Sequence, residues 1–447
     1  MGNVKKLLNK EMLFYITVSI GMAVSTTSFA IVSGVFSTLT SFWAIMSVAA
    51  SAILCLLIAR PIAELAGIFP AAPGIRTYLI QGFGNQTSLV FVFMYILFMI
   101  MIGSVENYMF ASVVQTIFPD FPAIYIVLLV ILFIVVINTY GLELPRTMQI
   151  ISVLILVSLI FGIGLTGIIQ SDSLVSSLKT SVSQENAGLL FPASIGFSLF
   201  LFVGFEWVTP LGFNAAAYER KIPLAMPVAI GINAIMYLIF FTGISGHFTN
   251  EVIAGTDVPQ SMLAARLFGY TGLWLALGLS LLGIISTFNA GIMGGARLIY
   301  GIAREGYLPQ KLARISLKRG TPVNAILSLG ISVFISSAFL LWLGLELLFA
   351  VIGSGIICFV YGMLIWSLLK IRKKHKKKKV RYASGLPRWF MWLLITLLFV
   401  FGIGSLMSIE EVQENALIGL PAVALIAFAG SSWMIRRKKK NQELKKG

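Results

Sequence analysis

Residues Phe191–Pro223 read FPASIGFSLFLFVGFEWVTPLGFNAAAYERKIP. The stretch begins as an apolar helix of membrane type, carries a carboxylate at Glu206 and then contains Pro210 and Gly212. Proline removes a backbone donor and clashes with the preceding turn, so we expect a break or kink near Pro210 and Gly212. Broken backbone at membrane depth is tolerated only where it is buried in protein or lines a cavity. An ionisable side chain beside such a break indicates a functional site.

Composition predicts that the chain lies in a membrane. Of its 447 residues, 58% are hydrophobic and 11% are charged, and the mean hydropathy is +0.94. A soluble protein of this length cannot bury so much apolar surface. The apolar runs are about 20 residues long, which matches a bilayer core, and they are continuous, unlike the alternating strands of outer-membrane barrels. The sequence therefore predicts an all-α polytopic membrane protein.

Twelve membrane spans are expected from these apolar runs. Each run is bounded by polar, Gly or Pro residues, which are typical of the ends of helices. The expected spans are approximately 12–36, 43–66, 88–116, 122–141, 147–170, 192–216, 223–248, 271–302, 322–344, 347–370, 388–408 and 415–435.

The basic residues are distributed unevenly around these spans. The chain has 33 Lys and Arg against 17 Asp and Glu, a net charge of +16, yet only Lys179 and Arg266 lie in loops after odd-numbered spans. Loops rich in Lys and Arg stay in the cytoplasm. Both termini are therefore predicted to be cytoplasmic, in a multi-pass protein of the cell membrane. The same distribution argues against a nucleic acid as partner.

The longest basic segment follows the tenth span. Residues 370–388 contain the run KKHKKKKVR, which includes His375, and the chain ends with a second run, RRKKK. A solvated loop that sets orientation is the favoured interpretation. Binding of membrane lipid headgroups is the alternative.

The first span has an irregularity of its own. Four hydroxyl residues, Ser25–Ser28, follow Gly21 in the middle of the span, and hydroxyls compete for backbone hydrogen bonds and weaken a helix. Spans 1 and 6 are thus both expected to be interrupted, five spans apart, as in transporters with inverted repeats. The segments Tyr78–Gly84 and Ala265–Tyr270, after spans 2 and 7, are a second pair of matching features, and both are expected to form short amphipathic helices.

Three stretches resemble signatures of the amino acid–polyamine–organocation permease superfamily. The first ends span 2, the second lies in and after span 6, and the third, which is the most specific, follows span 8. They read AELAGIFPAAPGIRTY at 63–78, GFE at 204–206 with RKIP at 220–223, and GGARLIY at 294–300 with AREG at 303–306, LP at 308–309 and RGTPVN at 319–324.

The resemblance covers at least spans 1 to 10 and implies a LeuT-type fold. Five spans and five inverted spans, with helices 1 and 6 discontinuous, would be followed by two peripheral helices. The division expected is a transport core at 1–370 (repeats 12–170 and 192–370), a basic cytoplasmic loop at 371–387, peripheral helices at 388–435 and a basic tail at 436–447.

The resemblance also implies a function. A chain of this kind is a secondary transporter that moves an amino acid or an amine-bearing organic cation by alternating access, as a monomer or homodimer. Proton-coupled symport or exchange is the favoured mechanism, and a sodium-coupled symporter of neutral amino acids is the alternative. No cofactor is implied beyond H⁺ or Na⁺ as the coupling ion.

The family's first span usually carries Gly-Ser-Gly-Ile-Phe, whose free amides hold the substrate carboxylate. The aligned residues here have lost both glycines, although their hydroxyls could replace part of that contact. We expect them to contribute to substrate binding: Ser25, Thr26, Thr27, Ser28 and Phe29.

Glu106 lies in the middle of the apolar third span. A lone carboxylate is costly to desolvate, so it either pairs or binds a cation. The functional interpretation, which we favour, is that Glu106 receives a substrate ammonium or guanidinium or carries a proton. A hydrogen-bonded structural Glu is the alternative.

Further roles follow from the resemblance alone. Glu206 is expected to act in substrate binding, gating and proton coupling, although it could instead cap the helix break. Phe200 matches a gating aromatic, Phe205 lies in the GFE motif, and both are expected to contribute to substrate binding. Ser286 and Thr287, with the hydroxyls of span 1, could form a sodium site, because Na⁺ prefers hard oxygen ligands. Some proton-coupled relatives place a span 5 lysine there, and 147–170 contains none.

Nothing in the sequence favours an enzyme or a channel over a transporter. A membrane-embedded enzyme needs a nucleophile, a base or metal ligands, and neither HExxH nor GxSxG occurs. Cys55 and Cys358 both lie in apolar runs and are interpreted as packing residues. A channel would not need paired broken helices. We therefore expect no catalytic residue and no metal site.

Overall fold

The fold is all-helical. A computed structural model describes residues 10–69, 74–140, 143–184, 187–212, 217–317, 319–374 and 382–443, and these ranges contain no strand. The main helices are α2 (Lys10–Ala23), α3 (Thr26–Thr38), α4 (Ser41–Ile68), α5 (Ile75–Phe83), α6 (Asn85–Gln115), α7 (Ala123–Thr139), α8 (Glu143–Ile169), α9 (Leu174–Thr180), α10 (Ala187–Ser198), α11 (Ile222–Ser245), α12 (Asn250–Ala254), α13 (Pro259–Phe268), α14 (Tyr270–Arg304), α15 (Val323–Leu343), α16 (Glu346–Lys374), α17 (Arg388–Leu406) and α18 (Gln413–Glu443).

Most of these helices are long enough to cross a membrane. Within the described ranges, ten helical segments have the length and apolar character of a span. The pair α2 and α3 passes the same test together but is bent by 48°, and α7 is an apolar helix of 17 residues. The polytopic membrane fold predicted from composition is therefore confirmed.

The first span breaks where the hydroxyl residues begin. α2 ends at Ala23, and Ser25 has extended backbone (φ −134°, ψ 172°) before α3 starts at Thr26. Ser25 and Ser28 form a capping box, in which each side chain bonds the backbone N–H of the other residue. The predicted interruption of span 1 is thus present, because the hydroxyls cap a new helix.

The sixth span breaks earlier than its proline suggests. After α10 and a short 3₁₀ helix, η1 (Leu199–Phe202), Val203 is extended and Gly204 has φ +112°. A second 3₁₀ helix, η2 (Phe205–Leu211), follows and contains Pro210. The break expected near Pro210 and Gly212 is therefore wrong in position. Pro210 lies in the last turn of η2, where the chain has already left the α-helical path.

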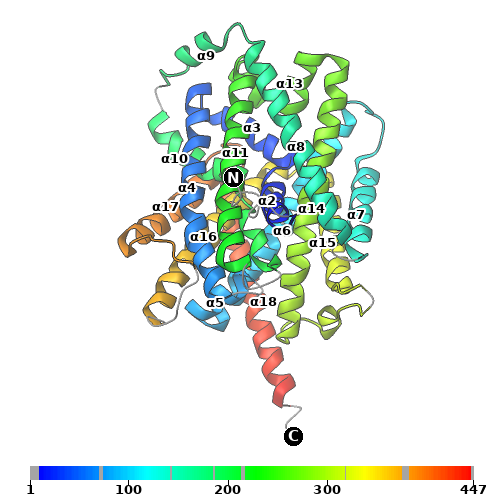
Figure 1. The fold of residues 1–447 in the computed structure, drawn as a ribbon, viewed down its shortest axis with the longest axis vertical. Coiled ribbons are helices and arrows are strands. Elements are labelled where there is room, and N and C mark those ends of the chain that lie inside the picture. The colour runs from blue at the N-terminus through cyan, green and yellow to red at the C-terminus, as the bar shows by residue number, and fades with distance from the viewer. Residues whose placement is uncertain are drawn as a thin grey trace.

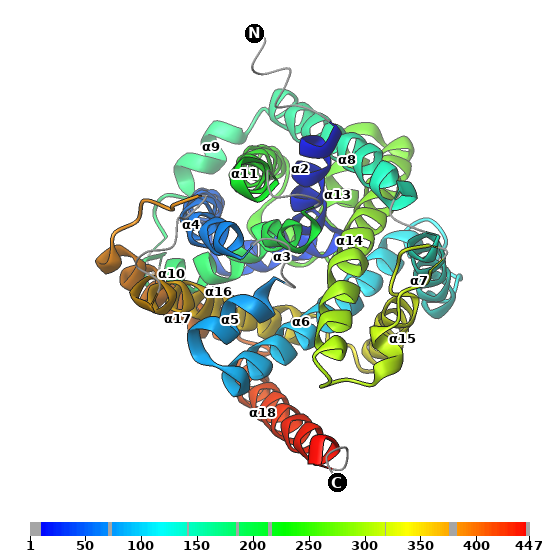
Figure 2. The same cartoon turned by 60° about the horizontal axis from the view of Figure 1, so that its bottom comes forward.

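The broken segments lie in the middle of the bundle. α2 and α3 are surrounded by α4, α6, α8, α11 and α14, while α7, α15, α17 and α18 lie at the periphery (Figure 2). α2 packs on η2, α8, α11 and α14. The short helices α5 and α13 follow spans 2 and 7, as expected, and the chain reverses at each. The two interrupted spans thus lie inside a ring of continuous helices.

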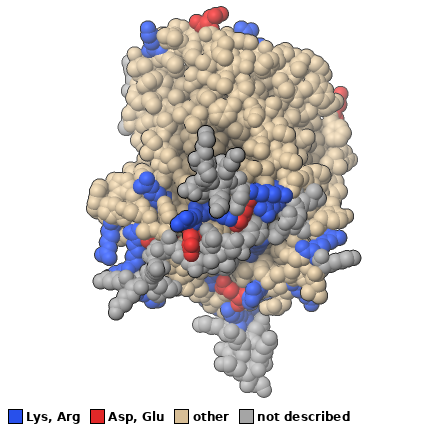
Figure 3. All heavy atoms as spheres, in the orientation of Figure 1, with Lys and Arg blue, Asp and Glu red and all other residues tan. Residues whose placement is uncertain are grey.

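The two ends of the molecule differ in charge. Lys and Arg gather at the end from which α18 extends, and fewer mark the opposite end, where α9 and α13 lie (Figures 1 and 3). Between these ends the visible face is almost uncharged (Figure 3). Large exposed apolar residues lie on the peripheral helices α7, α15 and α18, for example Leu129, Ile335 and Leu425. These faces suit contact with lipid.

Candidate functional site

The carboxylate of Glu106 lies against the start of α3. Its Oε1 accepts a hydrogen bond from the Thr26 backbone N–H at 2.8 Å. Its Oε2 accepts from the Thr27 backbone N–H at 2.8 Å and from the Thr27 hydroxyl at 2.7 Å. The unpaired amides at a helix start carry a partial positive charge and favour an anion. Glu106 therefore closes the break in span 1 from the facing helix α6.

Glu206 lies two residues beyond the Gly204 break and is buried. Its Oε1 accepts from the Tyr95 hydroxyl at 2.8 Å, and its Oε2 accepts from the Tyr361 hydroxyl at 2.6 Å and from the Gly204 N–H at 3.2 Å. Tyr95 comes from α6 and Tyr361 from α16. The carboxylate thus joins the broken sixth span to two continuous helices.

Neither central carboxylate has a cationic partner in the described part of the chain. The ion pairs there are Arg76–Glu305, Lys221–Glu11 and Arg372–Glu64. A buried carboxylate without an ion pair depends on hydrogen bonds alone, and it attracts any cation that can reach it. Glu106 and Glu206 therefore give the centre of the bundle an acidic character.

Two small cavities meet at Trp207. One, of about 30 Å³, is lined by Glu206, Tyr95 and Thr209 among others. The second, of about 40 Å³, is almost wholly apolar and is lined by residues such as Phe98 and Phe288. Met99 and Trp207 border both. Each cavity has room for water but not for an organic molecule, so the centre is closed in this conformation.

A polar cluster joins α2, the first half of span 1, to α8 and α14. The Gly21 carbonyl accepts from the Ser286 hydroxyl at 3.1 Å and the Thr287 hydroxyl at 3.0 Å. The Gln149 amide donates to the Thr17 carbonyl at 3.2 Å and to the Ser286 hydroxyl at 3.3 Å. A Cβ at Gly21 would lie 2.1 Å from Ser286 Oγ and 2.3 Å from Gln149 Nε2. Only glycine permits this close approach.

The residues predicted to bind substrate or sodium thus form contacts within the protein. Thr26, Thr27, Ser25 and Ser28 bond with Glu106 or with one another, and Ser286 and Thr287 meet Gly21 rather than those hydroxyls. The three aromatic residues pack on other rings, and the two central cavities are lined by none of them: Phe29 packs on Phe240, Phe200 on Phe98 and Phe205 on Tyr361.

Three contributors escaped the sequence analysis. Tyr95, Tyr361 and Gln149 each lie in an apolar run, where a single polar residue resembles a packing residue. Only the spatial meeting of α6, α8 and α16 with the breaks shows their role. The sequence did give one indication of their role. A Tyr hydroxyl or Gln amide buried in an apolar run needs a hydrogen-bond partner from another helix.

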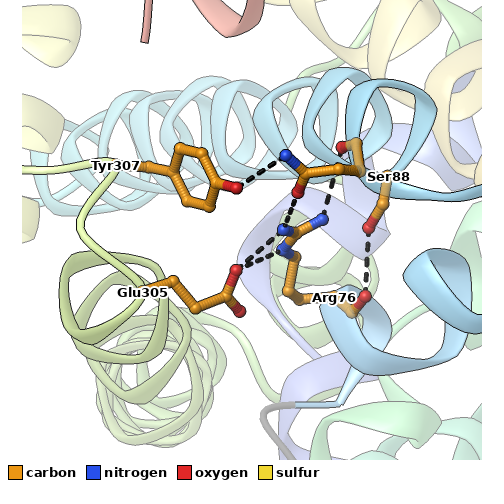
Figure 4. Close-up of polar contacts among 5 residues, drawn as sticks. Arg76, Ser88, Glu305 and Tyr307 are labelled. Carbon is orange, nitrogen blue, oxygen red and sulfur yellow. Dashed lines mark hydrogen bonds and ion pairs between the residues drawn. The ribbon is translucent and has the colours of Figure 1, made fainter. Parts of the chain in front are cut away.

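Two ion pairs, each with one buried partner, link helices at the end of the molecule from which α18 extends. Arg76 of α5 donates to Glu305, after α14, at 2.7 and 3.1 Å, and the Asn85 side chain bridges Arg76 to the Tyr307 hydroxyl (Figure 4). Arg76 is 1% exposed, although Glu305 is 34% exposed. The motif residue Glu64 pairs with Arg372 of α16.

Arg76→Ala is expected to destabilise the folded protein by about 3 kcal/mol, the lower end of the cost of breaking a buried ion pair, because Glu305 keeps some contact with water. Thermal unfolding of the detergent-solubilised protein measures this loss. The control is Arg266→Ala, at an exposed position of α13, which should change the free energy of unfolding by less than about 0.5 kcal/mol. Equal effects of the two variants would show that the Arg76 contacts contribute little.

Metal and disulfide chemistry find no support in the described ranges. No group of three His, Cys, Asp or Glu there could hold a metal ion, and Cys55 and Cys358 are free and buried.

Comparison with known proteins agrees with this architecture. The Eremococcus coleocola manganese transporter, one of several LeuT-fold structural neighbours, superposes with a TM-score of 0.58 at 13% identity, over 98% of this chain and 96% of that one. This likeness concerns the fold alone.

Sequence relatives are transporters rather than enzymes. The chain is 26% identical over 340 residues to the D-serine/D-alanine/glycine transporter of Escherichia coli (strain K12), which is 72% of this chain and 70% of that one. It is 30% identical over 128 residues to the uncharacterized amino acid permease YecA of Bacillus subtilis (strain 168), but spans only 30% of that protein's length. The family model described as "Amino acid permease" matches residues 12–443. The chain therefore belongs to the amino acid permease family, within the amino acid–polyamine–organocation superfamily.

Proposed function

We propose that this protein is a secondary active transporter that moves an amino acid or an amine-bearing organic cation across the cell membrane by alternating access. The observation that carries the proposal is the pair of broken spans at the bundle centre, each closed by a buried carboxylate, Glu106 or Glu206. Interrupted helices are where such transporters bind their substrates and coupling ions. The small cavities beside Trp207 represent an occluded state.

The proposed architecture is five spans plus five inverted spans with two peripheral helices. Counting α7 and the bent pair α2–α3 as spans gives the twelve that this architecture requires. The breaks at Ser25 and Gly204 fall in spans 1 and 6, and the short helices α5 and α13 follow spans 2 and 7. α17 and α18 are the peripheral pair.

The proposed orientation has both termini in the cytoplasm. It is supported by the basic end of the molecule, from which α18 extends (Figure 3), because Lys and Arg stay on the cytoplasmic side. Residues 375–381 of the basic segment 371–387 lie outside the described residues, and the segment is proposed to be a solvated loop near lipid headgroups. The protein functions as a monomer or homodimer.

Proton coupling or exchange is the mechanism we propose. The Gln149 amide donates to Thr17 O and Ser286 Oγ, which are hard oxygens of the kind that would ligate Na⁺. The Thr287 hydroxyl also directs its hydrogen toward Gly21 O. The neutral amide of Gln149 therefore occupies the position that Na⁺ would take. We assign to Glu206 the proton that is coupled to transport.

Replacing Na⁺ with K⁺ is expected to leave the initial rate of uptake unchanged, because Gln149 donates to the oxygens that Na⁺ would need. The measurement is uptake into proteoliposomes at constant ionic strength. A protonophore is the matched comparison, and it should lower accumulation if transport is proton symport. A rate that rises and saturates with Na⁺ would restore the sodium-coupled alternative.

The proposal as a whole is tested by reconstitution. Radiolabelled amino acids and amines are offered to proteoliposomes containing the full chain, with and without a pH gradient, and with unlabelled substrate inside to detect exchange. Saturable uptake or exchange of at least one compound is expected. If no candidate is taken up or exchanged, the transporter proposal is wrong.

A further inference from the structure

The start of α3 is an anion site that the protein fills with its own side chain. The Thr26 and Thr27 amides bind Glu106 at 2.8 Å each. The Ser28 amide binds the side chain and carbonyl of Ser25, at 3.3 and 3.2 Å. Half-helix N-termini inside transporters are places where anionic substrate groups bind. Here none of the first three amides is left for a second anion.

The Glu106 carboxylate is costly to displace from this place. Its residue is 0% exposed, and no described Lys or Arg forms an ion pair with it. If a ligand carboxylate took the amides, Glu106 would lose two of its three hydrogen bonds and would stay without an ion pair in an apolar interior. The two carboxylates would also repel each other. The arrangement therefore disfavours a substrate carboxylate.

An apolar cavity lies beside the segment of α6 that precedes Glu106. Glu106 follows Ile102 and Gly103 by about one helical turn on the same face of α6, and those two residues line the apolar cavity. Trp207 separates that cavity from the one that Glu206 lines. A molecule beside Trp207 would thus have a carboxylate toward each end.

Among the residues that the structure describes, no Lys or Arg lines either cavity. An ammonium group gains from a nearby carboxylate, and the face of a Trp ring attracts a cation as well. Met99 borders both cavities, and the flexible methionine side chain can move to join them. The lining can thus bind an amine, but none of its described side chains is a cation that would pair with a carboxylate.

We infer that the substrate is an organic amine without a free carboxylate, and that Glu106 determines this specificity. Glu106 occupies the position that the carboxylate of an amino acid would take, and so it acts as a built-in replacement for that group. The inference rests on the transport function proposed above and narrows its substrate class.

The test uses pairs of compounds that differ only by the carboxylate: phenethylamine and phenylalanine, cadaverine and lysine, isobutylamine and valine. Uptake into proteoliposomes of the wild-type chain is measured, with the rate in protein-free liposomes subtracted. In the transported pair the amine is expected to enter at least about tenfold faster than its amino acid. Faster or equal entry of the amino acid overturns the inference. Transport of neither member of any pair overturns the transport function itself, and the inference with it.

Glu106→Ala provides the second arm, because it vacates the Thr26 and Thr27 amides. The ratio of amine to amino acid uptake is expected to fall at least about tenfold, whereas Glu414→Ala, at an exposed position of α18, should leave it unchanged. An unaltered ratio in a folded Glu106→Ala protein contradicts the inference. Should that variant not fold, thermal stabilisation of the detergent-solubilised wild type decides instead. Stabilisation by the amine alone supports the inference, and stabilisation by the amino acid overturns it.

Discussion

Glu206→Gln is expected to lower the initial rate of uptake about 10- to 100-fold, the loss that corresponds to one hydrogen bond to a charged group. The amide can keep the local geometry. Its oxygen can accept from Tyr361 and Gly204, and its NH₂ can donate to the Tyr95 hydroxyl, which also accepts hydrogen bonds. What the variant loses is the charge and the ability to exchange a proton, so the response of uptake to a pH gradient should disappear as well.

The measurement pairs uptake in proteoliposomes with thermal unfolding in detergent. Glu410→Gln, in the exposed loop between α17 and α18, is the control and should match the wild type in both. A Glu206→Gln protein that unfolds near the wild-type temperature but transports poorly supports a role in binding or coupling. Wild-type transport by this variant would show that Glu206 serves only as a cap for the break.

The fold was largely predictable because its main determinants are local. Runs of apolar residues set the membrane helices, and four hydroxyls in succession set the break in span 1, since Ser25 and Ser28 cap α3 with their own side chains. The break in span 6 was misplaced by six residues. Pro210 is a strong local signal, but the residue that turns the chain is Gly204, whose positive φ is visible only in three dimensions.

The site was less predictable because its contacts are distant in sequence. Glu106 was singled out because a carboxylate is costly to desolvate in a membrane. Its partners, the backbone amides of Thr26 and Thr27, are about 80 residues away in the sequence. No pattern of side chains reveals a contact with backbone amides. Tyr95 and Tyr361 approach Glu206 from two other helices. Sequence reasoning therefore found both acids but not the groups that satisfy them.

Gly204→Ala is expected to destabilise the protein by roughly 2–6 kcal/mol, the sum of two separate costs. The first is backbone strain, because φ at this residue is +112°, a conformation that residues with a Cβ rarely adopt. The second is overpacking, since a Cβ would lie 2.4 Å from Met22 Cγ and 2.7 Å from Met22 Cβ. Thermal unfolding in detergent, followed by tryptophan fluorescence, measures the effect.

The control is Gly231→Ala in α11, where an added Cβ meets nothing within 4 Å and the backbone is helical. That variant should be neutral or gain about 0.4–1 kcal/mol, because alanine reduces the entropy of the unfolded chain. Met22 belongs to α2 and lines the apolar cavity, so Gly204 is one of the places where the two broken spans touch. If Gly204→Ala proved as stable as the control, the spans could not be packed as closely as described, and the Glu206 cap, which depends on the Gly204 amide, would have to be built differently.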